Sequence, residues 1–148
     1  MSVTDKTAPA QTDSLSFEFD LEHPPEKVWR ALTDPELLAQ WLLPVVDRDL
    51  VLAPGTAFTL KTQPYPGWDG TVQCRCVEIE PQRKLRYTWS VPFLDTVVTF
   101  TLTPTASGTR LSLEQSGFKT DQKREFGGAR YGWKMMGGKL VDLLGRMS

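Results

Sequence analysis

Apolar and polar residues alternate without a break in the stretch LSFEFDLE (15–22) near the start of the chain. Every second residue from Leu15 to Leu21 is apolar, and the residues between them are polar or acidic. This period of two is typical of a strand with one buried face. The preceding residues are polar, contain proline and show no period. We therefore expect a loose leader over residues 1–13 and a single domain over residues 14–148.

The period changes in the stretch PPEKVWRALTDPELLAQWL (24–42), where apolar residues lie three or four positions apart. Pro25 suits the first turn of a helix, because its missing N–H would have no partner there. The Thr-Asp-Pro sequence ends this helix and begins a second one, with Asp34 as the N-cap. Helices of this length are unstable alone. We therefore expect Trp29 and Trp41, on the apolar faces, to pack against a larger body.

Further alternating stretches, joined by short connections, predict strands between residues 45 and 116. They read VVDRDLVL, AFTLKTQ, WDGTVQCRCVEIE, KLRYTWSV, DTVVTFTLTP and TRLSLEQS. Connections this short favour antiparallel neighbours. Together with residues 15–22, these stretches predict an antiparallel sheet of seven strands.

The last part of the chain returns to helical spacing. From Gln122 onward, apolar residues recur at steps of three, four or seven, which predicts one helix of about 25 residues. The apolar stripe consists of Phe126, Trp133, Met136, Leu140, Leu143 and Met147. The glycines inside it are Gly127, Gly128, Gly132, Gly137 and Gly138. Each costs about 1 kcal/mol relative to alanine, and close approach to the sheet, a kink or a fraying first turn would each explain them.

The lengths of these elements determine how they assemble. An antiparallel sheet needs one covered face, and the last helix is the only predicted element long enough to cross it. The sequence therefore predicts an α+β fold in which a seven-stranded antiparallel sheet wraps around a long C-terminal helix. The two short helices would close one end of the sheet, with Trp29 and Trp41 filling that end. A cavity between the sheet and the helix would then be available to a guest.

Composition and charge mainly exclude functions. The chain has 148 residues, of which 40% are hydrophobic and 24% charged, as is ordinary for a globular protein. The formal net charge of −1 argues against a nucleic-acid partner or an acidic membrane, since both require clustered positive charge. No apolar run approaches the ~20 residues of a membrane span, and no signal peptide is visible. We therefore expect a cytoplasmic protein.

The sequence carries no signature of catalysis or metal binding. Cys74 and Cys76 lie two apart in a predicted strand, so they share a face, and we expect buried, reduced thiols. His23 is the only histidine, and we interpret it as a surface turn residue because it precedes Pro24 at a strand-to-helix junction. A metal site would need more ligands and a nucleophile would need a base beside it. We therefore expect no catalytic residue, metal or cofactor.

Four motifs, in this order, resemble those of a known family. They are P-P-E-x-V-W-x-A-L-T-D-P-E-x-L-x-x-W (Pro24 to Trp41), L-x-Y-T-W (Leu85 to Trp89), T-x-T-L-x-P before G-T-x-L-x-L (Thr99 to Leu113), and G-W (Gly132-Trp133). The chain resembles the START-like (SRPBCC) superfamily and, within it, the group named for the activator of the heat-shock-protein-90 ATPase. The resemblance covers residues 15–147. It implies a helix-grip fold whose cavity often holds an apolar ligand.

The resemblance implies several functions rather than one. The superfamily includes lipid carriers, polyketide aromatases and cyclases, antibiotic-resistance proteins that sequester a toxic natural product, and co-chaperone domains. A shared fold does not decide among them. The co-chaperones carry an additional N-terminal domain that engages the chaperone, so we expect no chaperone partner here. The sequence leaves a homodimer open.

Aromatic side chains supply the candidate site. The residues expected to line the space between sheet and helix are Phe58, Trp68, Tyr87, Trp89, Phe100, Phe126, Trp133 and Met136. Asp69, Arg130 and Tyr131 are candidate polar handles at its rim. This pattern favours a non-enzymatic protein that binds a small hydrophobic or aromatic molecule. The alternatives are a cyclase-, aromatase- or hydrolase-like enzyme, which would move protons with Asp69, Tyr87 or Tyr131, and a co-chaperone-type interaction module.

Overall fold

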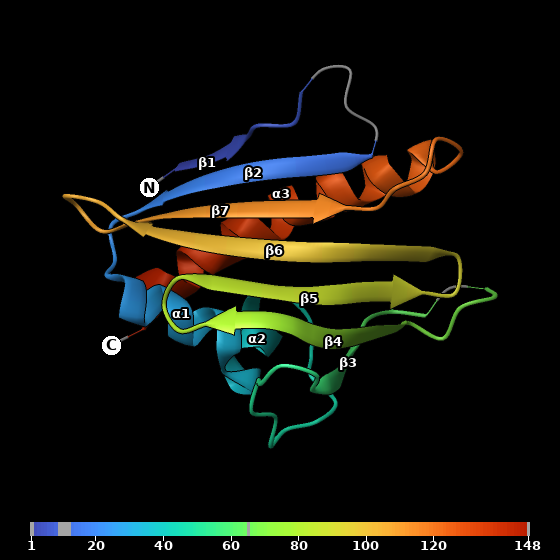
Figure 1. Ribbon diagram of the computed structural model, residues 1–148, viewed down its shortest axis with the longest axis horizontal. Helices are drawn as coiled ribbons and strands as arrows, with labels where there is room; N and C mark the ends of the chain where they lie inside the picture. Colours follow the sequence, from blue (N-terminus) through green and yellow to red (C-terminus); the bar gives the residue numbers. More distant parts are fainter. Residues whose placement is uncertain (1, 9–12, 65, 148) are drawn as a thin grey trace.

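An antiparallel sheet of seven strands, with helices on one face, makes up the described part of the protein (Figure 1). This computed structural model describes residues 2–8, 13–64 and 66–147. The strands are β1 (Ser2–Asp5), β2 (Ser14–Leu21), β3 (Ala57–Lys61), β4 (Thr71–Glu80), β5 (Lys84–Val91), β6 (Leu94–Pro104) and β7 (Thr109–Ser116). The helices are α1 (Pro25–Thr33), α2 (Pro35–Trp41) and α3 (Lys123–Arg146).

The strands lie in the order β1-β2-β7-β6-β5-β4-β3, and each strand is antiparallel to its neighbours. β2 pairs with β7 along its whole length, from Ser14 opposite Ser116 to Leu21 opposite Thr109. After β7 the chain turns back, and α3 runs behind the sheet (Figure 1). The predicted fold, a sheet wrapped around a C-terminal helix with two short helices after the first long strand, is confirmed.

One of the seven strands is formed by a different part of the chain than the sequence predicts. The sequence predicts a strand over residues 45–52, but these residues contribute only an isolated bridge between Val45 and Leu60. Asp47, Arg48 and Asp49 of this stretch are exposed, and charged residues at successive positions cannot supply the one buried face that a strand in this sheet needs. The prediction of a strand over residues 45–52 is therefore wrong.

The seventh strand is β1, which lies within the expected loose leader. It pairs with β2, placing Val3 opposite Phe19, and Val3 packs against the core. The exposed Asp5 side chain accepts a hydrogen bond from the Arg130 guanidinium of α3 at 2.5 Å. One apolar residue in four gives no readable period, so the sequence did not reveal this strand. Residues 1 and 9–12 of the expected leader lie outside the described residues.

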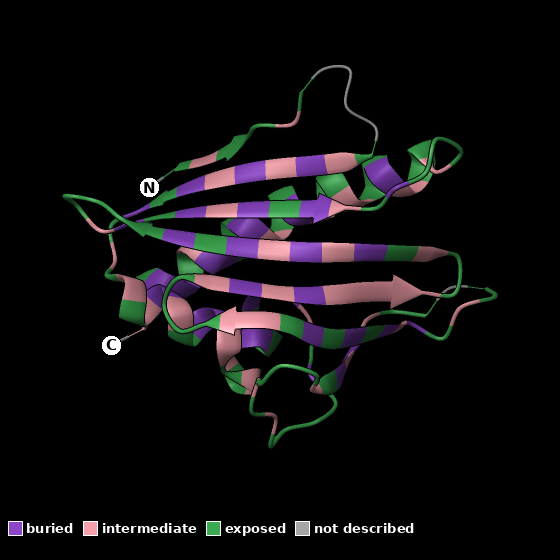
Figure 2. Cartoon of the chain, in the orientation of Figure 1, coloured by how far each residue is buried: buried purple, intermediate pink, exposed green. Residues whose placement is uncertain are grey.

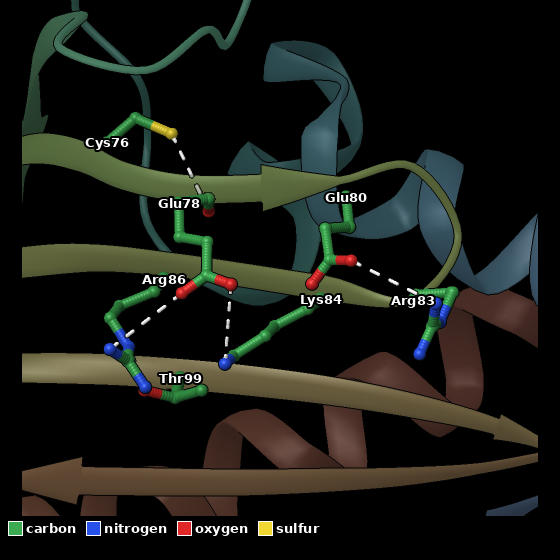
Figure 3. A network of polar contacts seen from close by, with 7 residues as sticks. All are labelled: Cys76, Glu78, Glu80, Arg83, Lys84, Arg86 and Thr99. Carbon is green, nitrogen blue, oxygen red and sulfur yellow. Dashed lines mark hydrogen bonds and ion pairs between the residues drawn. The ribbon is translucent and has the colours of Figure 1, made fainter.

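A β-bulge in β4 changes which side chains face the interior. The register between β4 and β5 shifts by one residue between Cys76 and Glu78, so Val77 is an extra residue in β4. As a result, Glu78 lies opposite Arg86 on the outer face, where it forms ion pairs with Arg86 and Lys84 (Figure 3). Exposed ion pairs of this kind contribute little to stability. The main consequence is that Ile79, which follows Glu78 and lies opposite Leu85, returns to the inner face.

The two short helices close one end of the structure, as predicted. Asp34 caps α2, because its carboxylate accepts a hydrogen bond from the Glu36 backbone N–H at 2.9 Å. Trp41 is 2% exposed, and its indole N–H donates to the Ala31 carbonyl at 2.8 Å. Trp29 is only partly buried, although it also packs against the core. Trp41 therefore fills this end more completely than Trp29 does.

The inner face of the sheet forms a continuous apolar core with α3. Buried and non-buried residues alternate along the strands, which is visible as bands in Figure 2. Cys74 and Cys76 lie on the inner face as buried, free thiols, as predicted. Among the helix glycines, Gly137 approaches the sheet most closely, since a Cβ there would lie 2.8 Å from the ring of Phe19. A close approach thus accounts for Gly137, whereas Gly127, Gly128 and Gly138 face open space.

Candidate ligand site between the sheet and the C-terminal helix

Aromatic rings fill the centre of the space between the sheet and α3. Phe58 contacts Tyr87 with ring centroids 5.2 Å apart, and Tyr87 contacts Phe100 at 6.1 Å. Phe100 contacts Trp133 of α3 at 6.0 Å, and Trp133 contacts Trp89 at 5.7 Å. Five of the eight predicted lining residues are therefore joined in one chain of ring contacts from β3 to α3. These contacts tie the helix to the middle strands.

A buried polar chain lies beside the rings. The Trp133 indole N–H donates to Gln115 Oε1 at 2.7 Å, and Gln115 Nε2 donates to Thr96 Oγ1 at 2.8 Å. Thr96 Oγ1 in turn donates to the Trp89 backbone carbonyl at 2.9 Å. Gln115 and Thr96 are 1% and 3% exposed. Because each member has a partner, this chain avoids the cost of burying polar groups and fixes α3 at one position on the sheet.

The structure therefore contains two site residues that the sequence interpretation missed, Gln115 and Thr96. Both occupy inward positions, because Gln115 follows Leu111 and Leu113 at the two-residue period and Thr96 precedes Val98. The two-residue repeat alone would have predicted that the Gln115 amide and the Thr96 hydroxyl lie between the sheet and α3. Inward-facing polar side chains are the signal to look for in such strands, since buried polar groups need partners.

The side chains between the sheet and α3 are less completely buried beside Trp89. On β5, the inward residues Leu85 and Tyr87 are 0% and 2% exposed, but Trp89 and Val91 are only partly buried. On α3, Met136 lies one turn after the buried Trp133 and is also only partly buried. Trp89 and Met136 are thus inward-facing side chains that solvent reaches. Both residues pack against the core, on β5 and on the flank of α3 that carries Met136.

The position of α3 explains why Trp89 and Met136 are only partly buried. Gly137 lets the helix approach β2 and β1, where Phe19 and Val3 are its nearest neighbours. Met136 lies about 100° around the helix from Gly137, on the flank turned away from that edge of the sheet. A helix drawn toward β1 and β2 leaves its opposite flank less well covered. The exposure of Met136 and Trp89 follows from this off-centre placement.

The remaining aromatic residues lie toward the end of the sheet where α3 begins. Trp68 contacts Phe93 with centroids 6.3 Å apart, and its indole N–H donates to the Thr71 carbonyl. Phe126 contacts Phe118 at 5.2 Å. Gln122 Nε2 donates to the Phe93 carbonyl at 2.9 Å, joining the loop before α3 to the turn between β5 and β6. Within residues 2–8, 13–64 and 66–147, the ring contacts of Trp68 and Phe126 are with Phe93 and Phe118 and not with the central chain of rings.

Burial controls the chemistry of the interior titratable groups. Burial raises the pKa of Tyr87 well above its usual range, and the nearby Cys74 and Cys76 thiols raise it further. Burial also raises the pKa of Cys74 to about 12 and raises the pKa of Cys76. At neutral pH all three groups are protonated and uncharged. The phenol can donate a hydrogen bond and the thiols are weak donors, but none of the three groups is a base at this pH.

The predicted polar handles lie outside this interior. Asp69 is exposed, and the hydrogen bond from the Thr71 backbone N–H holds the pKa of its carboxyl below the usual range. Arg130 bonds to Asp5 of β1. Tyr131 is 66% exposed. The structure thus brings five of the aromatic candidates together and places these three polar residues elsewhere.

Surface hollows do not coincide with the aromatic interior. Hollows of about 310 to 370 Å³ lie on the surface of the described part of the chain. Of the predicted site residues, Asp69 lines one of them, with Thr71, Gln73 and Ser90 among its neighbours. No group of three or more histidine, cysteine or acidic residues in the described part of the chain is arranged to hold a metal ion.

His23 also lies away from the aromatic interior. Its Nδ1 is 3.1 Å from Lys27 Nζ, and its backbone carbonyl accepts a hydrogen bond from Thr109 Oγ1 at 2.7 Å. The ring is partly buried, and its Nε2 is a buried atom without a partner among the described residues. Burial and the charge of Lys27 lower the pKa of His23. The residue belongs to the junction between β2 and α1, as predicted, but its ring is less exposed than a surface residue's.

A seven-stranded antiparallel sheet that grips a long C-terminal helix, with two short helices after its first long strand, defines a helix-grip protein of the START-like class. The sequence profile that matches residues 22–145 is that of the Activator of Hsp90 ATPase homolog 1-like proteins. The chain belongs to this family. In the described residues, no helix has both the length and the apolar character to cross a bilayer.

Solved structures show the same fold. Protein MLL2253 from Mesorhizobium loti is 42% identical in sequence, with a TM-score of 0.83 over 91% of this chain and 98% of that chain. CalU16 from Micromonospora echinospora is 24% identical, with a TM-score of 0.73 over 97% of this chain and 83% of that chain. DynU16, a putative protein in the dynemicin biosynthetic locus, is 24% identical, with a TM-score of 0.76 over 90% of this chain and 48% of that chain. Among curated proteins, none matches the chain.

Proposed function

We propose that the protein binds a small hydrophobic or aromatic molecule between the sheet and α3, entering beside Trp89 and Met136. The observation that carries this proposal is the incomplete burial of these two inward-facing side chains next to the fully buried Trp133. An apolar interior that solvent reaches beside Trp89 and Met136, with few polar groups, has the character of a small-molecule site.

The central rings already touch one another, so a guest must displace or reorient side chains where it enters. Met136 suits this role because its unbranched thioether side chain adapts to different shapes. Trp89 is held through its backbone carbonyl by Thr96, but its ring is partly free. We therefore place the guest against the rings of Trp89 and Trp133. Apolar area removed from water there would drive binding at about 25 cal/mol per Å².

The interior groups support binding more than catalysis. Tyr87, Cys74 and Cys76 are protonated at neutral pH, because burial raises the pKa of each side chain. Proton transfer requires a group whose pKa lies near the working pH. Asp69, the candidate acid, is exposed and has a lowered pKa. We accordingly propose sequestration or carriage of the guest without chemical change.

A binding screen tests the proposal. Native mass spectrometry of purified protein would detect a retained guest, and N-phenyl-1-naphthylamine, a neutral apolar fluorophore, would report on an accessible interior. We expect fluorophore binding that Trp89→Leu weakens several-fold. Trp29→Leu provides the matched control, because Trp29 is also partly buried but lies on α1. Absence of both a guest and fluorophore binding, or equal weakening by the two substitutions, would reject the proposal.

Chemical turnover is a separate outcome of the same experiment. Guests found by the screen can be incubated with the protein and recovered for mass analysis. We expect recovery of the unchanged molecule. A changed mass would retain the site but replace sequestration with catalysis.

A further inference from the structure

Charge is unevenly distributed between α3 and the rest of the chain. The 24 residues of α3 include six lysines and arginines and two acidic residues, a net charge of +4. The whole chain carries a formal net charge of −1, so the remaining residues carry −5. The overall charge, which argued against an acidic partner, therefore conceals a strongly basic element.

Most of this positive charge lies on the side of α3 that faces away from the sheet. At 100° per residue, the exposed Lys123, Arg124, Lys134 and Lys139 fall within one half of the helix circumference. Among the described residues, none of these four forms an ion pair, whereas Arg130 pairs with Asp5. Asp142 is the acidic residue on the same side. We call this surface, with Tyr131 and Met135, the basic face of α3.

The middle of the basic face carries two large, exposed side chains. Tyr131 is 66% exposed and Met135 51% exposed, and they are four residues apart, so they lie one above the other. Gly127, Gly128 and Gly138 surround them, and a Cβ at any of the three would meet nothing within 4 Å. The face thus combines long flexible cations at its edges with a low-relief centre that bears one aromatic and one apolar side chain.

We propose that the basic face of α3 docks on an anionic lipid surface. Helix α3 is about 36 Å long, and cations spread along a straight helix can all reach a plane at once. Lysine and arginine near an anionic membrane each add to binding, and tyrosine is suited to the membrane–water interface. The proposal is independent of the ligand site.

Vesicle binding tests this proposal with the full chain. We expect binding to phosphatidylcholine vesicles that contain phosphatidylserine, weakening with added salt, and much weaker binding to phosphatidylcholine alone. The combined variant Lys123→Gln, Lys134→Gln and Lys139→Gln should bind about 100-fold more weakly, since each cation contributes about fivefold. The matched control Lys6→Gln, Arg48→Gln and Arg83→Gln removes the same charge from exposed positions outside α3 and should retain binding.

A second measurement identifies the face that meets the lipid. A fluorophore sensitive to polarity can be attached at Met135→Cys and, as a control, at Thr101→Cys on the outer face of the sheet. Labelling should be selective because the two native thiols are buried. We expect a blue shift with phosphatidylserine vesicles at position 135 and none at position 101. Unchanged circular dichroism would confirm that the variants fold.

The proposal is overturned by several results. These are failure to bind phosphatidylserine vesicles, equal loss in the two triple variants, or a blue shift at position 101 rather than 135. Binding of polyglutamate or duplex DNA without binding of vesicles would also overturn it and would assign the basic face to a different macromolecule.

Discussion

Gly137 of α3 lies directly against the ring of Phe19 on β2, so that a methyl group at Gly137 would come within 2.8 Å of Phe19 Cε2. Phe19 is 1% exposed and has little room to move. This contact brings the helix to the β1–β2 edge of the sheet. It therefore sets the off-centre position of α3, on which the partial exposure of Trp89 and Met136 depends.

Adjacent glycines of α3 should respond in opposite ways to alanine. Gly137→Ala should lower the free energy of unfolding by about 1–2 kcal/mol, since overpacking against Phe19 outweighs the gain in helix propensity. Gly138→Ala should raise it by about 0.5–1 kcal/mol, because a Cβ there meets open space. Urea denaturation of both variants measures the difference. Stabilisation by both substitutions would show that α3 does not approach β2 this closely.

The buried polar chain should be sensitive to loss of its central amide. Gln115→Leu leaves the Trp133 indole N–H without its acceptor, so we expect a loss of about 1–3 kcal/mol in the free energy of unfolding. Trp133→Phe removes this N–H donor, which the first substitution leaves without an acceptor. A double-mutant cycle should therefore show that the combined loss is smaller than the sum of the two single losses. Additive losses would indicate that the two side chains are not bonded.

Stability should decrease on mild acidification because of His23. Burial and Lys27 lower the pKa of His23 in the folded protein, whereas the pKa of histidine in an unfolded chain is about 6.5. As the pH falls below about 6.5, the unfolded chain therefore binds a proton before the folded protein does, and the free energy of unfolding decreases.

This effect can be measured directly, because His23 is the only histidine in the chain. NMR titration of its ring should give a folded-state pKa below 6.5. The His23→Asn variant should show a weaker dependence of stability on pH between about 6.5 and the folded-state pKa. A titration at or above the unfolded value would contradict the environment described for this ring.

The two cysteines should be unreactive in the folded protein. The pKa of Cys74 is raised to about 12 by burial, and that of Cys76 is also raised, so at pH 8 thiolate is scarce and reagent access is poor. Reaction with a disulfide reagent should be slow in buffer and rapid for both thiols in denaturant. Rapid reaction of one thiol in buffer would mean that this part of the inner face is open.

Much of the architecture follows from periodicity in the sequence. The alternation in residues 15–22 predicted β2, and the spacing of three to four residues after Gln122 predicted α3. A long element with one buried face produces a clear repeat of apolar residues in the sequence. Two local features were not predictable in this way. β1 contains a single apolar residue, Val3, and its pairing depends on a neighbour distant in sequence. The bulge at Val77 shifts the phase within a strand that otherwise alternates regularly.

The candidate site was partly predictable for the same reason. The repeat of apolar positions along each strand and helix predicted that Tyr87, Phe100 and Trp133 face the interior. Their rings do form a chain of contacts there. The position of a residue in such a repeat does not show whether the rings touch or leave a gap, because this depends on the distance between the helix and each strand. The contact of Gly137 with Phe19 determines that distance. The sequence alone left the reason for this glycine open.

The methyl signals of two neighbouring methionines test the central claim, a guest site on the β5 side of α3. Met136 is partly buried beside Trp133, whereas Met135 is 51% exposed on the basic face. Protein with carbon-13-labelled methionine methyl groups can be titrated with N-phenyl-1-naphthylamine and followed by NMR. We expect the Met136 signal to shift with saturation while the Met135 signal stays in place. A shift of Met135 alone, or of neither methyl group, would contradict the account.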